Sequence, residues 1–119
     1  MRISTTLGSS VQTTITPIVK QAELLLVKSG NESVAQLISG RAEAWANTYD
    51  AFKFMQKEQP DLAVVPGPAM GFDRVALAHR KGDNETKAWL DNFVVAERSN
   101  GNLLRIIAKY GLDNSYLAD

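Results

Sequence analysis

The residues best suited to chemistry near the start of the chain are Gly8, Ser9 and Ser10, which form a polar turn. Glycine lets the backbone approach a ligand closely, and successive backbone N–H groups at the start of a helix favour a carboxylate or another anion. The two serine hydroxyls can donate hydrogen bonds to the same group. The alternative is that the serines simply cap the helix that follows. The turn is therefore either a ligand contact or an ordinary helix start.

A second polar cluster, made of Asn47, Thr48 and Asp50, follows the predicted third strand. In an open parallel sheet, ligands bind beside the carboxyl ends of the strands. This position makes the three side chains candidates for ligand contacts. Asp50 can instead cap the helix that begins nearby.

The other polar residues show no arrangement typical of catalysis or metal binding. The chain has one histidine, His79, which we expect at the surface, and no cysteine. Its acidic residues are not paired in a way that suggests acid–base catalysis, and no His/Asp/Glu cluster has metal-ligand spacing. We therefore expect a binding protein rather than an enzyme, without a cofactor or a metal ion.

Charge and length narrow the class of partner. The 13 basic and 13 acidic residues cancel, so no charge excess favours nucleic acid or an anionic membrane. A small neutral or zwitterionic ligand fits this balance better. No apolar run is long enough to cross a membrane, and the first residues lack the apolar core of a signal peptide. At 119 residues, the chain is one domain by length.

Strand and helix patterns alternate along the chain, which is typical of an α/β fold with a parallel sheet covered by helices. The predicted strands span residues 3–6, 23–27, 42–47, 62–65 and 72–79, and the second, a continuous apolar run, is expected to be buried on both faces. The first predicted helices span 11–20, shortened or kinked by Pro17, and the stretch from the N-cap Asn31 to the C-cap Gly40. A third spans 49–57. The last two follow the N-cap Asp83 and end near Gly111.

The segment Pro66-Gly67-Pro68 is the best candidate boundary, and it divides the chain into residues 1–70 and 71–119. Beyond it, two predicted helices carry apolar stripes that include Trp89 and Phe93. Such stripes do not stay in water as one contiguous patch. The two helices either fold back on their own lobe or pair with a second copy, and we expect a homodimer.

Three stretches, in this order, resemble motifs of one protein family. They are Thr5-Thr6-Leu7-Gly8-Ser9-Ser10, Gly40-Arg41-Ala42-Glu43-Ala44, and Val75 to Asp83 followed by Asn100-Gly101 and Lys109-Tyr110-Gly111. Together they resemble the second lobe and C-terminal segment of family 3 extracellular (periplasmic) solute-binding proteins of amino-acid ABC transporters. The resemblance implies one lobe of a type II periplasmic binding protein. Residues 1–70 would form the lobe, and residues 71–119 would form a crossover strand and helices that in the family pack on a first lobe.

In this family, an amino acid binds between two lobes that close by a hinge motion. The resemblance therefore implies a small-molecule ligand such as an amino acid, an ABC-transporter permease as the partner of the full-length parent, and a periplasmic or extracellular location. It also implies that the first lobe, which precedes the Gly8 turn in the family, is not in this chain. The implied ligand-binding residues are Thr6, Gly8, Ser9, Ser10, Asn47, Thr48 and Asp50.

One position departs from the family pattern. The family places an aspartate, which receives the ligand's ammonium group, eight residues after the glycine that matches Gly40, and here that residue is Thr48. Asp50 lies two residues further on. Two alternatives use the same scaffold: a cyclohexadienyl-dehydratase-like enzyme, with Asp50 or Glu43 as its general acid, and a sensor domain, which would need flanking membrane segments.

Overall fold

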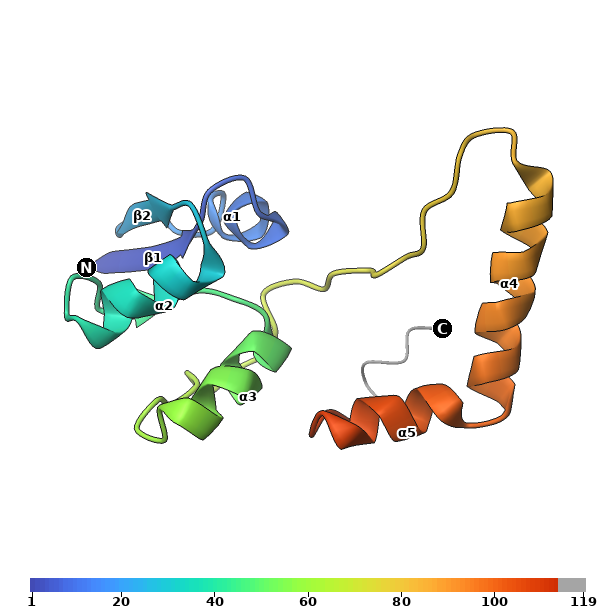
Figure 1. Ribbon diagram of the computed structural model, residues 1–119. Helices are drawn as coiled ribbons and strands as arrows, with labels where there is room; N and C mark the ends of the chain where they lie inside the picture. Colours follow the sequence, from blue (N-terminus) through green and yellow to red (C-terminus); the bar gives the residue numbers. More distant parts are fainter. Residues whose placement is uncertain (114–119) are drawn as a thin grey trace. The chain divides into compact units, whose positions relative to one another are not determined.

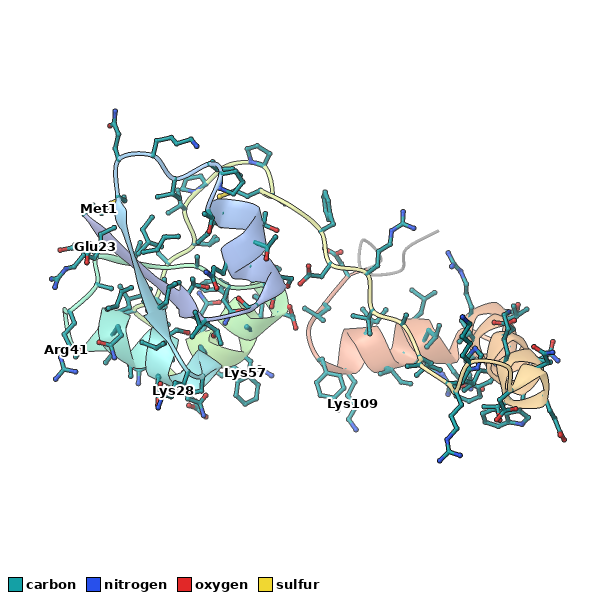
Figure 2. The ribbon with its side chains drawn as sticks, turned by 90° about the horizontal axis from the view of Figure 1, so that it is seen from above. Met1, Glu23, Lys28, Arg41, Lys57 and Lys109 are labelled. Atoms are coloured by element: carbon teal, nitrogen blue, oxygen red, sulfur yellow. The ribbon has the colours of Figure 1, made fainter. Side chains whose placement is uncertain are left out.

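Three short strands form a parallel sheet in the order β2-β1-β3, and the structure, a computed structural model (Figure 1), describes residues 1–113. The strands are β1 (Arg2–Thr6), β2 (Glu23–Val27) and β3 (Ala44–Trp45). The sheet and its helices confirm a mixed α/β fold. Met1 and Glu23 lie together at one end of the sheet and Lys28 lies at the other, as parallel pairing requires (Figure 2).

The central strand is β1, so β2 is an edge strand of this sheet. Leu26, in the apolar run of β2, is 37% exposed, and Glu23 is exposed as well. The prediction that this strand is buried on both faces is therefore wrong. An apolar run favours burial of a strand, but it does not specify which other segments lie against the two faces of that strand.

The described residues contain five helices, and each follows from local signals in the sequence. In the first unit they are α1 (Ser10–Ile15), α2 (Gly30–Ile38) and α3 (Tyr49–Glu58). The remaining two are α4 (Asn84–Ser99) and α5 (Asn102–Lys109). Helix α1 is shorter than the predicted 11–20 because Pro17 follows its C-cap Thr16, and a helix rarely continues through a proline.

Helix α2 has clear signals at both ends. Its N-cap is Ser29 rather than the predicted Asn31, because the Ser29 hydroxyl accepts from the Glu32 N–H. At the other end, Gly40 has a positive φ of 72°, and the N–H groups of Gly40 and Arg41 donate to the carbonyls of Leu37 and Gln36. This is a Schellman motif, and it confirms the predicted glycine C-cap.

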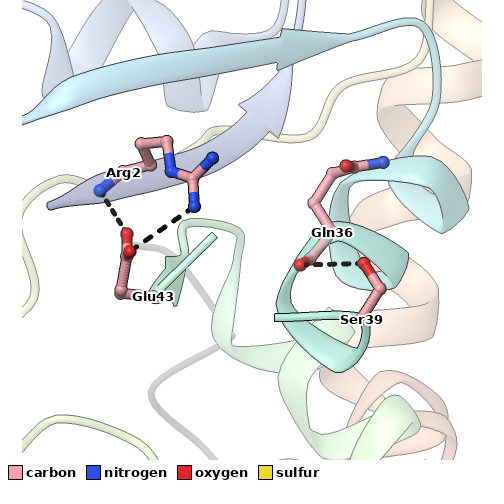
Figure 3. Close-up of polar contacts among 4 residues, drawn as sticks. All are labelled: Arg2, Gln36, Ser39 and Glu43. Atoms are coloured by element: carbon pink, nitrogen blue, oxygen red, sulfur yellow. Dashed lines mark hydrogen bonds and ion pairs between the residues drawn. The ribbon is translucent and has the colours of Figure 1, made fainter. Parts of the chain in front are cut away.

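The chain then enters β3 beside the start of β1, where the Glu43 carboxylate accepts from the Arg2 N–H and lies 3.6 Å from the Arg2 guanidinium (Figure 3). The hydrogen bond from the Arg2 N–H lowers the pKa of Glu43. Figure 3 also shows the Ser39 hydroxyl donating to the Gln36 carbonyl at the end of α2. These contacts hold both ends of the turn that leads into β3.

A small buried layer joins α2 to the sheet. Ser4 and Ser33 are fully buried, and the Ser4 hydroxyl donates to the Ser33 carbonyl at 2.7 Å. The Trp45 indole N–H donates to the Ser33 hydroxyl at 2.9 Å. Ile15 and Val34 supply the apolar part of the core. Because each buried hydroxyl has a partner, this layer positions α2 across the sheet without leaving a polar group unpaired.

Two predicted strands are absent from the described residues. Residues 62–65 and 72–79 are irregular, and most of their apolar side chains are exposed: Val65 is 83% exposed and Val75 is 97% exposed, whereas Leu62 is half-buried. The apolar patterns fit strands, but a strand forms only where another strand completes its hydrogen bonds. No described segment pairs with these residues.

The chain divides into two units between Asp73 and Arg74, three residues beyond the boundary predicted after residue 70. In the second unit, α4 packs against α5, and the Trp89 and Phe93 rings stack with centroids 5.4 Å apart. The end of the predicted second segment, residues 114–119, lies outside the described residues.

Asp83 is the N-cap of α4, as predicted, because its carboxylate accepts from the Thr86 N–H and the Thr86 hydroxyl. These hydrogen bonds lower the pKa of Asp83. A carboxyl whose pKa is lowered by folding stabilises the folded state above its ordinary pKa and loses that contribution as pH falls through the lowered pKa.

We expect acidification below about pH 4 to fray the first turn of α4. The protection of the Thr86 and Lys87 amides against hydrogen exchange, relative to the intrinsic rate at each pH, should fall more steeply than that of the α5 amides over this range. The variant Asp83→Asn keeps a capping side chain that does not titrate, so its exchange should lose this pH dependence. The same pH dependence in Asp83→Asn would show that another group is responsible.

Candidate functional site

The two predicted clusters lie at the same edge of the sheet. Strand β1 ends at Thr6 and β3 ends at Trp45, and these neighbouring strands are parallel, with Ser4 opposite Trp45. After β1, the chain forms β2 on one side of β1, and it then crosses over to form β3 on the other side of β1. The strand order therefore changes direction between β1 and β3. Ligands of open α/β sheets bind at such a switch point.

The start of α2 lies at this edge as well. A Cβ atom placed on Gly30 would lie 4.0 Å from the side-chain nitrogen of Asn47. The loops after all three strands therefore meet here. We call residues 6–10 and 47–50 together the strand-end site.

In the first half of this site, the turn makes several hydrogen bonds within the chain. The Gly8 N–H donates to the Gln12 side-chain oxygen at 2.7 Å, and Gly8 has a positive φ of 74°. The Ser9 hydroxyl accepts from the Gln12 N–H and donates to the Thr6 carbonyl. The alternative prediction for Ser9, an ordinary helix N-cap, is thus what the structure contains.

Ser10 has a partner far along the chain. Its hydroxyl donates to the Asp73 carboxylate at 2.6 Å, although the two residues are 63 positions apart. Both side chains are exposed. The last residue of the first unit therefore reaches one of the predicted ligand-binding residues.

The second half of the site is more open. Thr48 is the N-cap of α3, yet its side chain makes no capping hydrogen bond, and its N–H donates to the Asn47 side-chain oxygen at 2.8 Å. Asp50 lies in the first turn of α3. Asn47 and Asp50 are exposed and Thr48 is half-buried. The Thr48 hydroxyl, the Asp50 carboxylate and the Asn47 amide nitrogen can accept or donate hydrogen bonds at the sheet edge while the Asn47 oxygen keeps its contact with the Thr48 N–H.

Two residues that matter at the site were not predicted, Gln12 and Asp73. A signal for Gln12 exists in the sequence, because Ser9 and Gln12 have the spacing of a capping box, as do Ser29 and Glu32. In both cases the long side chain accepts an N–H from the residue before the cap, Gly8 or Lys28. No local pattern points to Asp73, because its contact depends on how the chain returns to α1.

A groove of about 380 Å³ lies between α2 and α3, and it is lined by Asn31, Val34, Ile38, Phe54 and Met55 among others. None of the residues of the strand-end site lines it. Among residues 1–113, no three His, Asp or Glu side chains are grouped as a metal ion would require. His79 is exposed, as expected.

A scan against protein-family models finds no match to this chain, and a search of curated proteins finds no relative. Within the described part of the chain, no helix is both long enough and apolar enough to span a membrane.

Proposed function

We propose that this chain is the second lobe and C-terminal segment of a solute-binding protein, and that it captures a small polar ligand, an amino acid, for uptake by an ABC transporter. The protein performs no reaction in this role and acts in the periplasm or outside the cell. One observation supports this proposal above the others: the parallel sheet brings residues 6–10 and 47–50, both predicted from the sequence, to one edge at its switch point.

The proposal predicts weak binding by the chain in solution. Gly8, Ser10, Asn47 and Asp50 are exposed, so water competes for each hydrogen bond that a ligand makes. We expect dissociation constants in the millimolar range or weaker, on the order of −4 kcal/mol or less favourable in binding free energy.

The test is a titration of the ¹⁵N-labelled chain with the common L-amino acids up to about 20 mM, followed by amide chemical shifts. A small set of amino acids should cause saturable shifts confined to residues 6–10 and 47–50. Shifts elsewhere, such as in the groove between α2 and α3, or no shift with any amino acid, would contradict the proposal.

Thr48 provides a sharper test. Replacing it by aspartate places a carboxylate where a ligand's ammonium group can pair with it, and aspartate is also a good N-cap for α3. We expect Thr48→Asp to tighten amino-acid binding about tenfold, equivalent to about 1.4 kcal/mol. The control is Thr48→Asn, which can cap the helix equally well but carries no charge. Equal affinities of the two variants would show that Thr48 does not face the ligand.

We also propose that the chain forms a homodimer through α4 and α5. Trp89 is 63% exposed, Ile106 51% and Tyr110 61%, although each is a large apolar side chain. Exposed apolar patches of this kind are typical of protein interfaces. A second copy would cover them with the same side chains, because a two-fold interface is self-complementary.

A further inference from the structure

The segment that leaves the first unit contacts α1 at two points. Asp73 accepts from the Ser10 hydroxyl at 2.6 Å, and Gly71 lies directly against Thr14. A Cβ atom added to Gly71 would lie 2.8 Å from the Thr14 methyl carbon, which is closer than real side chains approach. The backbone at Gly71 therefore lies so close to α1 that a side chain at this position would not fit without a shift.

The two contacts have matching spacing. Ser10 and Thr14 are four residues apart, so they lie on one face of α1 about 6 Å apart along its axis. Gly71 and Asp73 are two residues apart, a distance that an extended chain spans in at most about 7 Å. The segment therefore runs along this face in the direction opposite to α1, and we call residues 71–73 the strap.

We propose that the strap competes with the ligand for the Ser10 hydroxyl, so that Asp73 lowers the affinity of the strand-end site until it is displaced. This inference rests on the proposed function. The Ser10 hydroxyl has one proton to donate, and it is donated to Asp73. A ligand carboxylate that uses Ser10 has to take the same proton and also meets the negative charge of Asp73.

The first experiment measures glycine binding, as the smallest zwitterionic probe, from amide shifts of residues 6–10 in the full chain. Asp73→Asn keeps the size of the side chain but removes the charge, and we expect its dissociation constant for glycine to fall at least threefold. The control is Asp61→Asn, an exposed aspartate of the same unit, which should bind like the wild type. Weaker glycine binding by Asp73→Asn would show that Asp73 is itself a ligand-binding residue, and would overturn the proposal.

A second variant, Gly71→Ala, is designed to displace the strap from α1 without changing any charge. In Gly71→Ala, the added methyl group collides with Thr14, whose β-branched side chain has little freedom to move, so the strap has to leave α1. We expect the same threefold or larger gain in glycine affinity. In the double variant Gly71→Ala/Thr14→Ser, the colliding methyl is gone, and the affinity should return to that of the wild type. A gain that the double variant keeps would contradict the contact along α1.

The contact between the strap and α1 can also be followed in the absence of a ligand, by the amide chemical shifts of α1. Asp73→Asn and Gly71→Ala should shift the same amides of α1, around Ser10 and Thr14. If neither variant gains glycine affinity, the competition between Asp73 and the ligand is disproved. The proposed function is tested separately, by whether Thr48→Asp binds amino acids more tightly than Thr48→Asn.

Discussion

Replacing Ile15 by alanine is expected to unfold the first unit in a large fraction of molecules while leaving α4 and α5 helical. Ile15 is 2% exposed and is among the largest fully buried side chains of the described residues. Removing a buried isoleucine side chain costs about 2 to 5 kcal/mol, and a unit of this size has little stability in reserve. Because Ile15 is the buried residue of α1, and α1 packs against β1, the strand-end site should be lost with it.

The measurement is urea unfolding of the ¹⁵N-labelled chain, followed separately by amide signals of β1 and of α4. Only the β1 signals should lose intensity at lower urea in Ile15→Ala. The matched control is Ile18→Ala, three residues further on, where the side chain is 53% exposed and the expected loss is below about 1 kcal/mol. Equal destabilisation by the two variants would mean that α1 does not pack as the structure has it.

Replacing Trp89 and Phe93 together by alanine is expected to convert the proposed homodimer to a monomer. The two rings stack 5.4 Å apart on α4 and remain 63% and 42% exposed. Aromatic side chains supply much of the binding energy of protein interfaces, often about 2 kcal/mol or more each. Removing one ring therefore weakens association roughly thirtyfold or more. The loss should be large because both rings belong to one patch.

Light scattering at several concentrations is the measurement. The wild type should have the mass of two chains and the double variant that of one, while circular dichroism shows that α4 is retained. The control is Asn92→Ala, an exposed polar residue of the same helix, which should leave the dimer intact. A wild-type chain that is monomeric at all concentrations would exclude the homodimer.

Most of the helices and the first two strands could be predicted because their signals are local. Pro17 limits α1, Gly40 ends α2 and Asp83 begins α4, and each acts through its own backbone geometry or through neighbours a few residues away. The cap of α2 was placed on Asn31 instead of Ser29, although the spacing of Ser29 and Glu32 is that of a capping box.

The strands at 62–65 and 72–79 were predicted from apolar patterns that are present, but no described strand pairs with them. A helix completes its hydrogen bonds within its own segment, whereas a strand requires a partner that its own sequence does not specify. This difference explains why each predicted helix is present in the described residues, with shifts only at its ends, whereas two of the predicted strands are not.

The same distinction applies to the candidate site. The polar turn at Gly8, the cap at Ser9 and the cluster at Asn47 to Asp50 could be found from adjacent residues alone. The fold was needed to show that the two clusters share one edge, through the order β2-β1-β3, and that Asp73 reaches Ser10 from 63 positions away. Contacts between distant segments depend on how the whole unit packs, and no local spacing in the chain encodes them.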